Sequence, residues 1–186
     1  MGSDDADLMR RCQGGDRSAF EELVDRWQQP VARFVYRLTG RADLAPDLCQ
    51  EVFLRVFRAA PRYREGGGFR TWLYRIALNV SRDALRRSRR PAESLDGVDL
   101  ADRIAAGDAT CEQRELSGLV EHAVAELPEP LRLVLALRHD EGMSFEEIAR
   151  LTGTPASTVK SRFVAALARL RVRFRELGLA PEENAR

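Results

Sequence analysis

One stretch of the sequence combines side chains that bind polyanions with side chains that build a core. Residues 69–90 read FRTWLYRIALNVSRDALRRSRR, with seven arginines, one asparagine and a single acid, Asp83. Guanidinium groups bind phosphate oxygens in bidentate geometry, and an asparagine amide can hydrogen-bond the edge of a base. The stretch also holds large apolar residues. By composition, residues 69–90 form either a core helix that happens to be basic or a surface that binds a negatively charged partner.

Helical spacing separates these side chains into two stripes of one helix. We expect the stripe with Arg75, Asn79, Arg82 and Arg86 to face nucleic acid, with Arg70, Thr71 and Tyr74 near its start. Trp72 is assigned to the core rather than to base stacking. The expected buried stripe consists of Phe69, Trp72, Leu73, Ile76, Ala77, Val80, Ala84 and Leu85.

A second candidate for DNA binding lies in residues 143–171, MSFEEIARLTGTPASTVKSRFVAALARLR. Ser144 and Glu147 have the spacing of a capping box, and Gly153 can supply a turn. Thr154 is a predicted N-cap, with Pro155 at the first helical position. This layout predicts a helix-turn-helix, and an ordinary amphipathic hairpin is the alternative.

The second helix of this pair has the small and polar face that a recognition helix needs in the major groove. Apolar residues occupy its other side at helical spacing. The expected base-reading residues are Ala156, Ser157, Lys160, Ser161 and Val164, and the expected phosphate contacts on the flank are Thr158, Arg162 and Arg169.

The chain as a whole reads as helix, because no stretch alternates like a strand. The expected fold is all-α, with two small helical domains joined by a flexible acidic linker. The predicted bounds are residues 1–90 for the first domain, 91–113 for the linker, 114–180 for the second domain and 181–186 for a disordered tail. The predicted helices are 18–38, 44–59, 69–90, 115–127, 131–138, 144–151 and 155–177, with three or four helices in the first half.

Charge is sharply segregated along the 186 residues, although the net charge is only +1. Residues 61–92 carry 9 basic and 2 acidic groups, whereas residues 93–130 carry 2 basic and 10 acidic groups. Such blocks indicate separate surfaces for separate partners. No apolar run approaches the roughly 18 residues of a membrane span, and the start lacks an apolar signal core. We therefore expect a cytoplasmic protein without membrane insertion.

The sequence gives little support to an enzyme. Cys12, Cys49 and Cys111 lack the spacing of metal ligands or of a disulfide framework. The two histidines, His122 and His139, do not make a metal site by themselves, although a metal-dependent hydrolase that uses one of them is a rival function class. We expect no catalytic residue, no metal and no cofactor.

Three sequence blocks together closely resemble one family. They are DLCQEVFLRVFRAAPRY (47–63), FRTWLYRIALN (69–79) and LPEPLRLVLALRHDEGMSFEEIARLTGTPASTVKSRFVAALARLR (127–171). Their order and separation resemble the bacterial RNA polymerase sigma factors of the extracytoplasmic-function type. The resemblance covers residues 7–90 and 114–176, and it departs from the usual pattern at Pro130-Leu131 and His139-Asp140.

The resemblance implies a factor that binds core RNA polymerase and directs transcription from particular promoters. The first domain is then expected to bind the β′ clamp and the −10 element, and the second to bind the −35 element and the β flap. An anti-sigma partner is also expected. The clamp contact is carried over onto Asp47, Gln50, Glu51, Leu54 and Arg55.

The resemblance also assigns the DNA contacts. The loop 62–68 is expected to capture a flipped base of the −10 non-template strand, because its glycines let backbone approach a base closely. The expected −10 set is Arg62, Tyr63, Arg64, Gly66, Gly67, Phe69, Arg70, Thr71, Tyr74, Arg75, Asn79, Arg82 and Arg86. The expected −35 set is Thr154, Ala156, Ser157, Thr158, Lys160, Ser161, Arg162 and Val164.

Two hypotheses remain open at this point. The acidic segment 93–130 either occupies the polymerase channel that later holds RNA or is merely a soluble linker. Neutralising Asp96, Asp99, Asp102 and Asp108 should alter abortive synthesis in the first case. The alternative function is a stand-alone helix-turn-helix transcriptional regulator, which would bind its DNA site without core polymerase.

Overall fold

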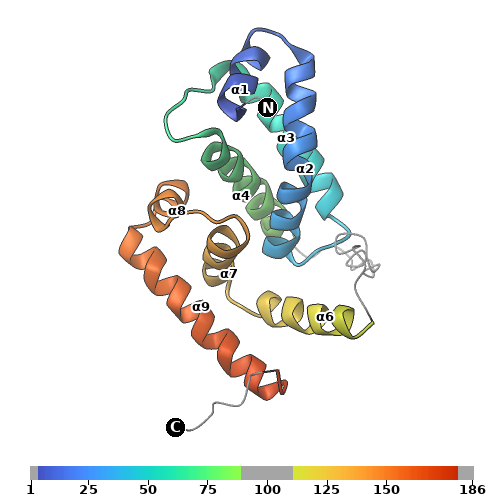
Figure 1. The fold of residues 1–186 in the computed structure, drawn as a ribbon, viewed down its shortest axis with the longest axis vertical. Coiled ribbons are helices and arrows are strands. Elements are labelled where there is room, and N and C mark those ends of the chain that lie inside the picture. Colours follow the sequence, from blue (N-terminus) through green and yellow to red (C-terminus); the bar gives the residue numbers. More distant parts are fainter. Residues whose placement is uncertain (1–3, 89–110, 180–186) are drawn as a thin grey trace. The chain divides into compact units, whose positions relative to one another are not determined.

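The computed structural model describes residues 4–88 and 111–179, which form two compact helical units. These residues contain no strand, in agreement with the all-α prediction (Figure 1). Within them, no helix is long and apolar enough to cross a membrane. The N-terminal unit consists of α1 (Asp5–Gln13), α2 (Arg17–Thr39), α3 (Ala45–Ala59), the 3-10 turn η1 (Ala60–Arg62) and α4 (Phe69–Ser88).

Helix α2 is the centre of the N-terminal unit and packs against α1, α3 and α4. It begins where Asp16 accepts hydrogen bonds from the backbone N–H groups of Ser18 and Ala19. It ends at Gly40, whose φ of 68° suits glycine. The fully buried side chains of this core include Leu8, Met9, Leu23, Val31, Leu38 and Leu73.

The C-terminal unit consists of α6 (Cys111–Ala125), α7 (Glu129–Leu135), the π-helical turn η2 (Ala136–Asp140), α8 (Phe145–Thr152) and α9 (Ala156–Glu176). Helix α6 begins at Cys111, inside the predicted linker 91–113. The rest of that linker and the predicted tail lie outside the described residues.

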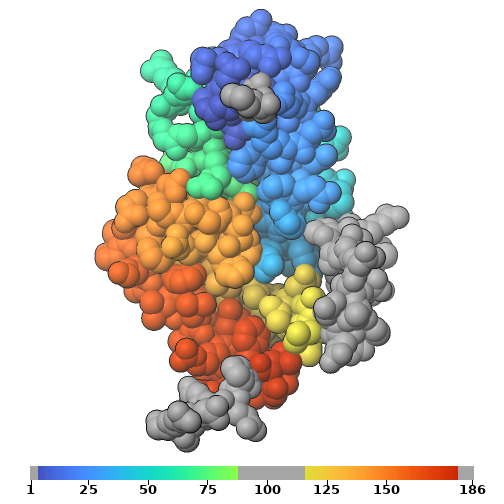
Figure 2. Space-filling model, in the orientation of Figure 1, coloured from blue at the N-terminus to red at the C-terminus, as the bar shows by residue number. Residues whose placement is uncertain are grey.

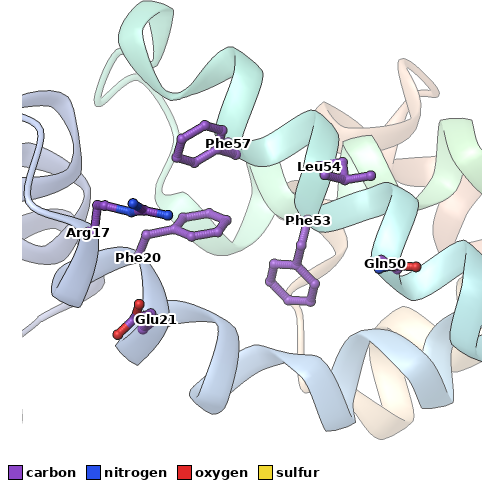
Figure 3. A pocket seen from close by; sticks show the side chains of 7 residues that line it. All are labelled: Arg17, Phe20, Glu21, Gln50, Phe53, Leu54 and Phe57. Atoms are coloured by element: carbon purple, nitrogen blue, oxygen red, sulfur yellow. The ribbon is translucent and has the colours of Figure 1, made fainter.

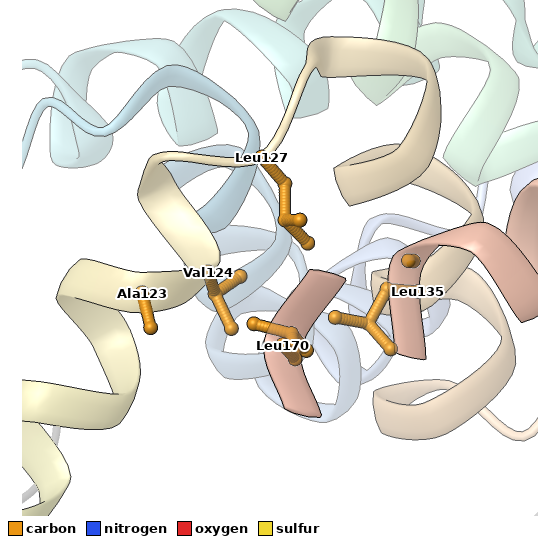
Figure 4. Packing of buried hydrophobic residues seen from close by; sticks show 6 residues of the cluster. Ala123, Val124, Leu127, Leu135 and Leu170 are labelled. Atoms are coloured by element: carbon orange, nitrogen blue, oxygen red, sulfur yellow. The ribbon is translucent and has the colours of Figure 1, made fainter. Parts of the chain in front are cut away.

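One apolar cluster holds α6, α7 and α9 together (Figure 4). Leu131, Phe163 and Phe174 pack against it. An ion pair of 2.9 Å between Arg173 and Glu126 also joins α9 to α6. The cluster consists of Ala123, Val124, Leu127, Leu135, Ala166 and Leu170.

The predicted capping box at the start of α8 is present. The Ser144 N–H donates to Glu147 Oε2 at 2.7 Å, and the Glu147 N–H donates to Ser144 Oγ at 3.1 Å. These bonds satisfy two backbone donors that a helix start leaves open.

The turn between α8 and α9 differs from its prediction by one residue. Gly153 has a φ of 66°, as a left-handed turn requires. Helix α9 begins at Ala156, and Pro155 occupies the N-cap position predicted for Thr154. The reason is that the Pro155 carbonyl already accepts the first helical bond, from the Val159 N–H at 3.0 Å.

Candidate nucleic-acid interface

Helix α4 presents the predicted basic stripe to solvent. Arg75, Asn79, Arg82 and Arg86 are all exposed. They recur at helical spacing, so they form one face opposite the side that packs on α2 and α3. This face offers three guanidinium groups around one amide, which suits contact with a phosphate backbone and one base edge.

The buried face of α4 is rotated relative to its prediction. Tyr74 is fully buried, and its ring meets the edges of Phe34 at 5.0 Å and Trp27 at 6.1 Å between ring centroids. A residue enclosed in this way cannot contact DNA, so its assignment to the exposed side was wrong. Thr71 and Phe69 are also buried, with 6% and 4% of their surface exposed.

Trp72 is half-buried instead of lying in the core, as are Ile76 and Leu85 of the predicted core stripe. The physical reason is that α4 packs its Tyr74 side on Phe34 and Trp27 of α2. Leu78 and Ser81 are buried along with Tyr74. The residues of α4 that are buried are Phe69, Thr71, Leu73, Tyr74, Ala77, Leu78, Val80, Ser81 and Ala84.

An aromatic cluster stands where the loop between α3 and α4 begins. The rings of Tyr63 and Trp72 lie 4.9 Å apart between centroids, and the ring of Phe69 lies 5.9 Å from that of Trp72. Tyr63 is only 8% exposed, and burial raises the pKa of its hydroxyl. Trp72 is therefore the partly accessible ring beside the loop, and the buried ring of Tyr63 packs against it.

The loop itself is open to solvent on the edge of the N-terminal unit, in green in Figures 1 and 2. Arg62, Arg64, Gly66 and Gly67 are exposed, as predicted. Gly67 and Gly68 have φ values of 134° and 83°, which side chains rarely adopt. A ligand can therefore approach the backbone of this loop without meeting a Cβ atom.

The exposed side of α3 carries the residues predicted for polymerase contact. Asp47, Gln50 and Leu54 are exposed, and 45% of the Leu54 surface is accessible. Glu51 and Arg55 are half-buried, and the Arg55 Nε donates to Glu51 Oε1 at 2.7 Å.

An apolar groove adjoins this face, between α2 and α3 (Figure 3). The Phe20 ring packs edge-on against Phe57 at 5.1 Å, and 57% of the Phe57 surface is exposed. Sequence reasoning missed Phe57, although its position three residues after Leu54 could have indicated a shared face. The groove has a volume of about 290 Å³ and is lined by Arg17, Phe20, Glu21, Gln50, Phe53, Leu54 and Phe57.

Helix α9 presents most of its predicted reading face to solvent. Ser157, Lys160, Ser161 and Val164 are exposed, with 59% of the Val164 surface accessible. The opposite side is held by Val159, Ala166 and Leu170, which are buried. The remaining predicted residues, Thr154, Ala156, Thr158 and Arg162, are half-buried along the flank.

The described residues contain no cluster of three or more His, Cys, Asp or Glu side chains that could hold a metal ion. His139 Nδ1 lies 2.9 Å from Asp140 Oδ1, in an exposed pair of neighbours. Burial raises the pKa of the Cys49 thiol to about 11, so this cysteine is not a thiolate nucleophile at neutral pH.

Comparison with protein families gives two matches. Residues 23–91 match the model of Sigma-70 region 2, and residues 117–170 match that of Sigma-70 region 4. The "ECF RNA polymerase sigma-E factor" of Escherichia coli K12 is 38% identical over 170 residues, which cover 86% of this chain and 88% of the relative. The "RNA polymerase sigma-H factor" of Pseudomonas aeruginosa is 36% identical, with 87% and 89% covered.

Two solved structures share the fold. CnrH, solved in complex with the cytosolic domain of CnrY, gives a TM-score of 0.70 at 26% identity and covers 92% of this chain and 97% of its own. The sigma factor RpoE of Bartonella quintana, solved with the anti-sigma factor NepR, gives a TM-score of 0.69 at 21% identity, with 84% and 96% covered.

Proposed function

The chain belongs to the extracytoplasmic-function sigma factors of bacterial RNA polymerase, and we propose that its exposed residues divide into three surfaces that serve the contacts of such a factor. It binds core polymerase and promoter DNA and directs promoter-specific initiation. It acts by binding and is not an enzyme. Family membership disfavours the stand-alone regulator and the hydrolase.

The first surface reads and opens the −10 element. The exposed stripe of α4 supplies Asn79 as the base reader and Arg75, Arg82 and Arg86 as phosphate contacts. The loop 62–68 captures the flipped base. Unpairing costs a few kcal/mol per flipped base, and stacking on an aromatic ring returns about 1–3 kcal/mol per base. Trp72 replaces Tyr74 as the ring available for this stacking, because Trp72 is the one with accessible surface.

The second surface reads the −35 element as duplex. The exposed side of α9 carries the small side chains that let a helix enter the major groove. Lys160, Ser157 and Ser161 are the base-edge contacts in this proposal. Arg162 and Thr158, half-buried on the flank, contact phosphates.

The third surface docks on the polymerase clamp and consists of Asp47, Gln50, Glu51, Leu54 and Arg55 of α3. Leu54 is its apolar anchor in this proposal, because 45% of its surface is exposed among the charged and polar residues of the same face. The second unit contacts the β flap. Both contacts place the protein in the cytoplasm, where the polymerase acts.

Two further parts of the proposal concern partners and the linker. An anti-sigma factor binds the chain, as the family resemblance implies; CnrH, which shares the fold, was itself solved in complex with another protein, the cytosolic domain of CnrY. The acidic linker occupies the RNA channel as a transcript mimic, on the strength of its charge alone. Most of this linker lies outside the described residues. Unchanged abortive yields on neutralising its aspartates would exclude that role.

One observation supports this division most strongly: the two candidate DNA surfaces, on α4 and α9, belong to different units that share one near-neutral chain. A net charge of +1 gives weak non-specific affinity for DNA. We therefore expect a promoter footprint over both elements only when core polymerase is present. A strong, specific footprint of the isolated chain would favour the stand-alone regulator.

A further inference from the structure

The last residue of helix α1 contacts the turn from which the loop 62–68 departs. This residue, Gln13, donates through Nε2 to the carbonyl oxygens of Ala60 at 3.1 Å and Tyr63 at 2.8 Å. Both partners are acceptors only, so the amide must present its amino group to them. One side chain therefore joins α1 to both ends of the turn that leads from α3 into the loop.

The turn that Gln13 holds is the point from which the loop departs. The Tyr63 N–H donates back to the Ala60 carbonyl at 3.0 Å, which closes the 3-10 turn. The Tyr63 ring is buried beside Trp72, whereas residues 64–68 are exposed. Beyond Tyr63, the Gly66 N–H donates to the Arg64 carbonyl at 2.7 Å within the loop, and the Gly68 carbonyl accepts from the Trp72 N–H at 3.3 Å where α4 begins.

Helix α1 is a firm support for this contact. Leu8 and Met9 are fully buried. Asp5 forms an ion pair of 2.6 Å with Arg26 of α2, and Arg11 forms one of 2.8 Å with Asp16. Arg10 approaches Glu65 of the loop at 3.7 Å, but both side chains are more than half exposed, so this pair adds little.

We propose that Gln13 is a positioning residue for base capture: it fixes the Tyr63 carbonyl, and with it the place and direction in which the capture loop leaves the folded unit. This inference rests on the proposed role of the loop. A loop that must receive one unstacked base gains affinity and selectivity when it is already held in its binding geometry. Gln13 supplies that restraint at Tyr63, near the start of the loop 62–68, and in this proposal it does not itself touch DNA.

The test uses the full chain with core polymerase and promoters that carry each base at each −10 position. Gln13→Glu keeps the shape of the side chain but replaces the donor with a carboxylate that repels both carbonyl oxygens. We expect the preference for the favoured base at the captured position to fall by about threefold to tenfold. Preference at the −35 element should not change. Gln13→Ala, which adds no charge, should give the same loss.

Gln29→Glu is the matched control, because Gln29 is an exposed residue of α2 and gives the same change of charge. It should leave both preferences unchanged. Gln13 is itself exposed, so its variants should melt close to the wild type, and thermal unfolding checks this. Equal weakening at the −10 and −35 elements, or an intact −10 preference in Gln13→Glu, would overturn the positioning role. If the wild type itself shows no −10 preference with core polymerase, the proposed role of the loop fails instead.

Discussion

Arg55 of α3 and Asp83 of α4 form an ion pair, with 3.2 Å between Arg55 Nη1 and Asp83 Oδ2. Arg55 also bonds Glu51, and the other Asp83 oxygen accepts from Arg86. Asp83 is the single acid of α4, and its two arginine partners lie on two proposed surfaces, one for polymerase and one for DNA. A network of charged side chains thus joins α3, the helix proposed to dock on the clamp, to α4, the helix proposed to contact the promoter.

Replacing Asp83 with asparagine should weaken this link only modestly. The four side chains of this network are all partly exposed, so we expect a loss of about 0.5–1 kcal/mol in the free energy of unfolding by urea. They are Glu51, Arg55, Asp83 and Arg86. Asp43→Asn, which breaks the Arg41 pair within one loop, makes the same charge change and is the control. A loss of several kcal/mol for Asp83→Asn alone would mean that the network is a structural centre rather than a surface link.

Acid should weaken the start of α2 in a defined window of pH. Hydrogen bonds from Ser18 and Arg11 lower the pKa of Asp16 to about 2, from an ordinary value of 3.8. Because the folded pKa is the lower one, the carboxylate's contribution to stability is complete above about pH 4 and is lost as the pH falls toward 2. Urea unfolding between those limits should show a steeper decline for the wild type than for Asp16→Asn. Parallel curves would contradict this assignment.

Truncating Tyr74 should damage the fold before it affects promoter choice. Tyr74→Ala removes a fully buried ring that contacts Phe34 and Trp27, so we expect a loss of about 3–5 kcal/mol in the free energy of unfolding. Asn79→Ala, on the exposed face of the same helix, should cost about 0.5 kcal/mol or less. If Tyr74→Ala were as stable as the wild type and had altered −10 selectivity, the sequence-based assignment of Tyr74 to the DNA face would be right after all.

Alanine substitutions of Asn79 and Arg82 should change promoter binding in different ways. Asn79→Ala should change the relative strength of promoters that differ in the −10 element, because an amide reads a base edge. Arg82→Ala should weaken all promoters alike and reduce the salt dependence by about one phosphate contact. Holoenzyme binding to a promoter library at several salt concentrations separates the two, with the exposed Arg33→Ala of α2 as the control. Identical profiles for both variants would contradict the division into reader and phosphate contact.

Local rules predicted the features that depend on neighbouring residues. The Ser144–Glu147 capping box, the end of α2 at Gly40 and the exposed stripe of Arg75, Asn79 and Arg82 all follow from spacing within one helix. Spacing alone did not predict where the buried face of α4 ends. Trp72 and Tyr74 flank Leu73 on both sides, and only the packing on Phe34 and Trp27 decides which ring is enclosed.

Contacts between distant parts of the chain were beyond sequence reasoning. Gln13 and Tyr63 are fifty positions apart, and Arg55 and Asp83 are twenty-eight apart. Neither pair shares a helix, so no periodic pattern connects its members. The groove at Phe57 was missed because residues of two different helices line it, with Phe20 on α2 and Phe53 and Phe57 on α3. The sequence thus predicted most of the residues that are exposed on these faces, and the structure adds what holds those faces in place.

Run-off transcription with purified core polymerase, with and without this chain, over a promoter library tests the central claim most directly. Core polymerase alone should give no promoter-specific transcript. Adding the chain should produce run-off products from a defined subset of promoters that share −10 and −35 sequences. The absence of any chain-dependent, promoter-specific transcript, or an identical set of products with and without the chain, would contradict the assignment of this protein as a factor that directs initiation.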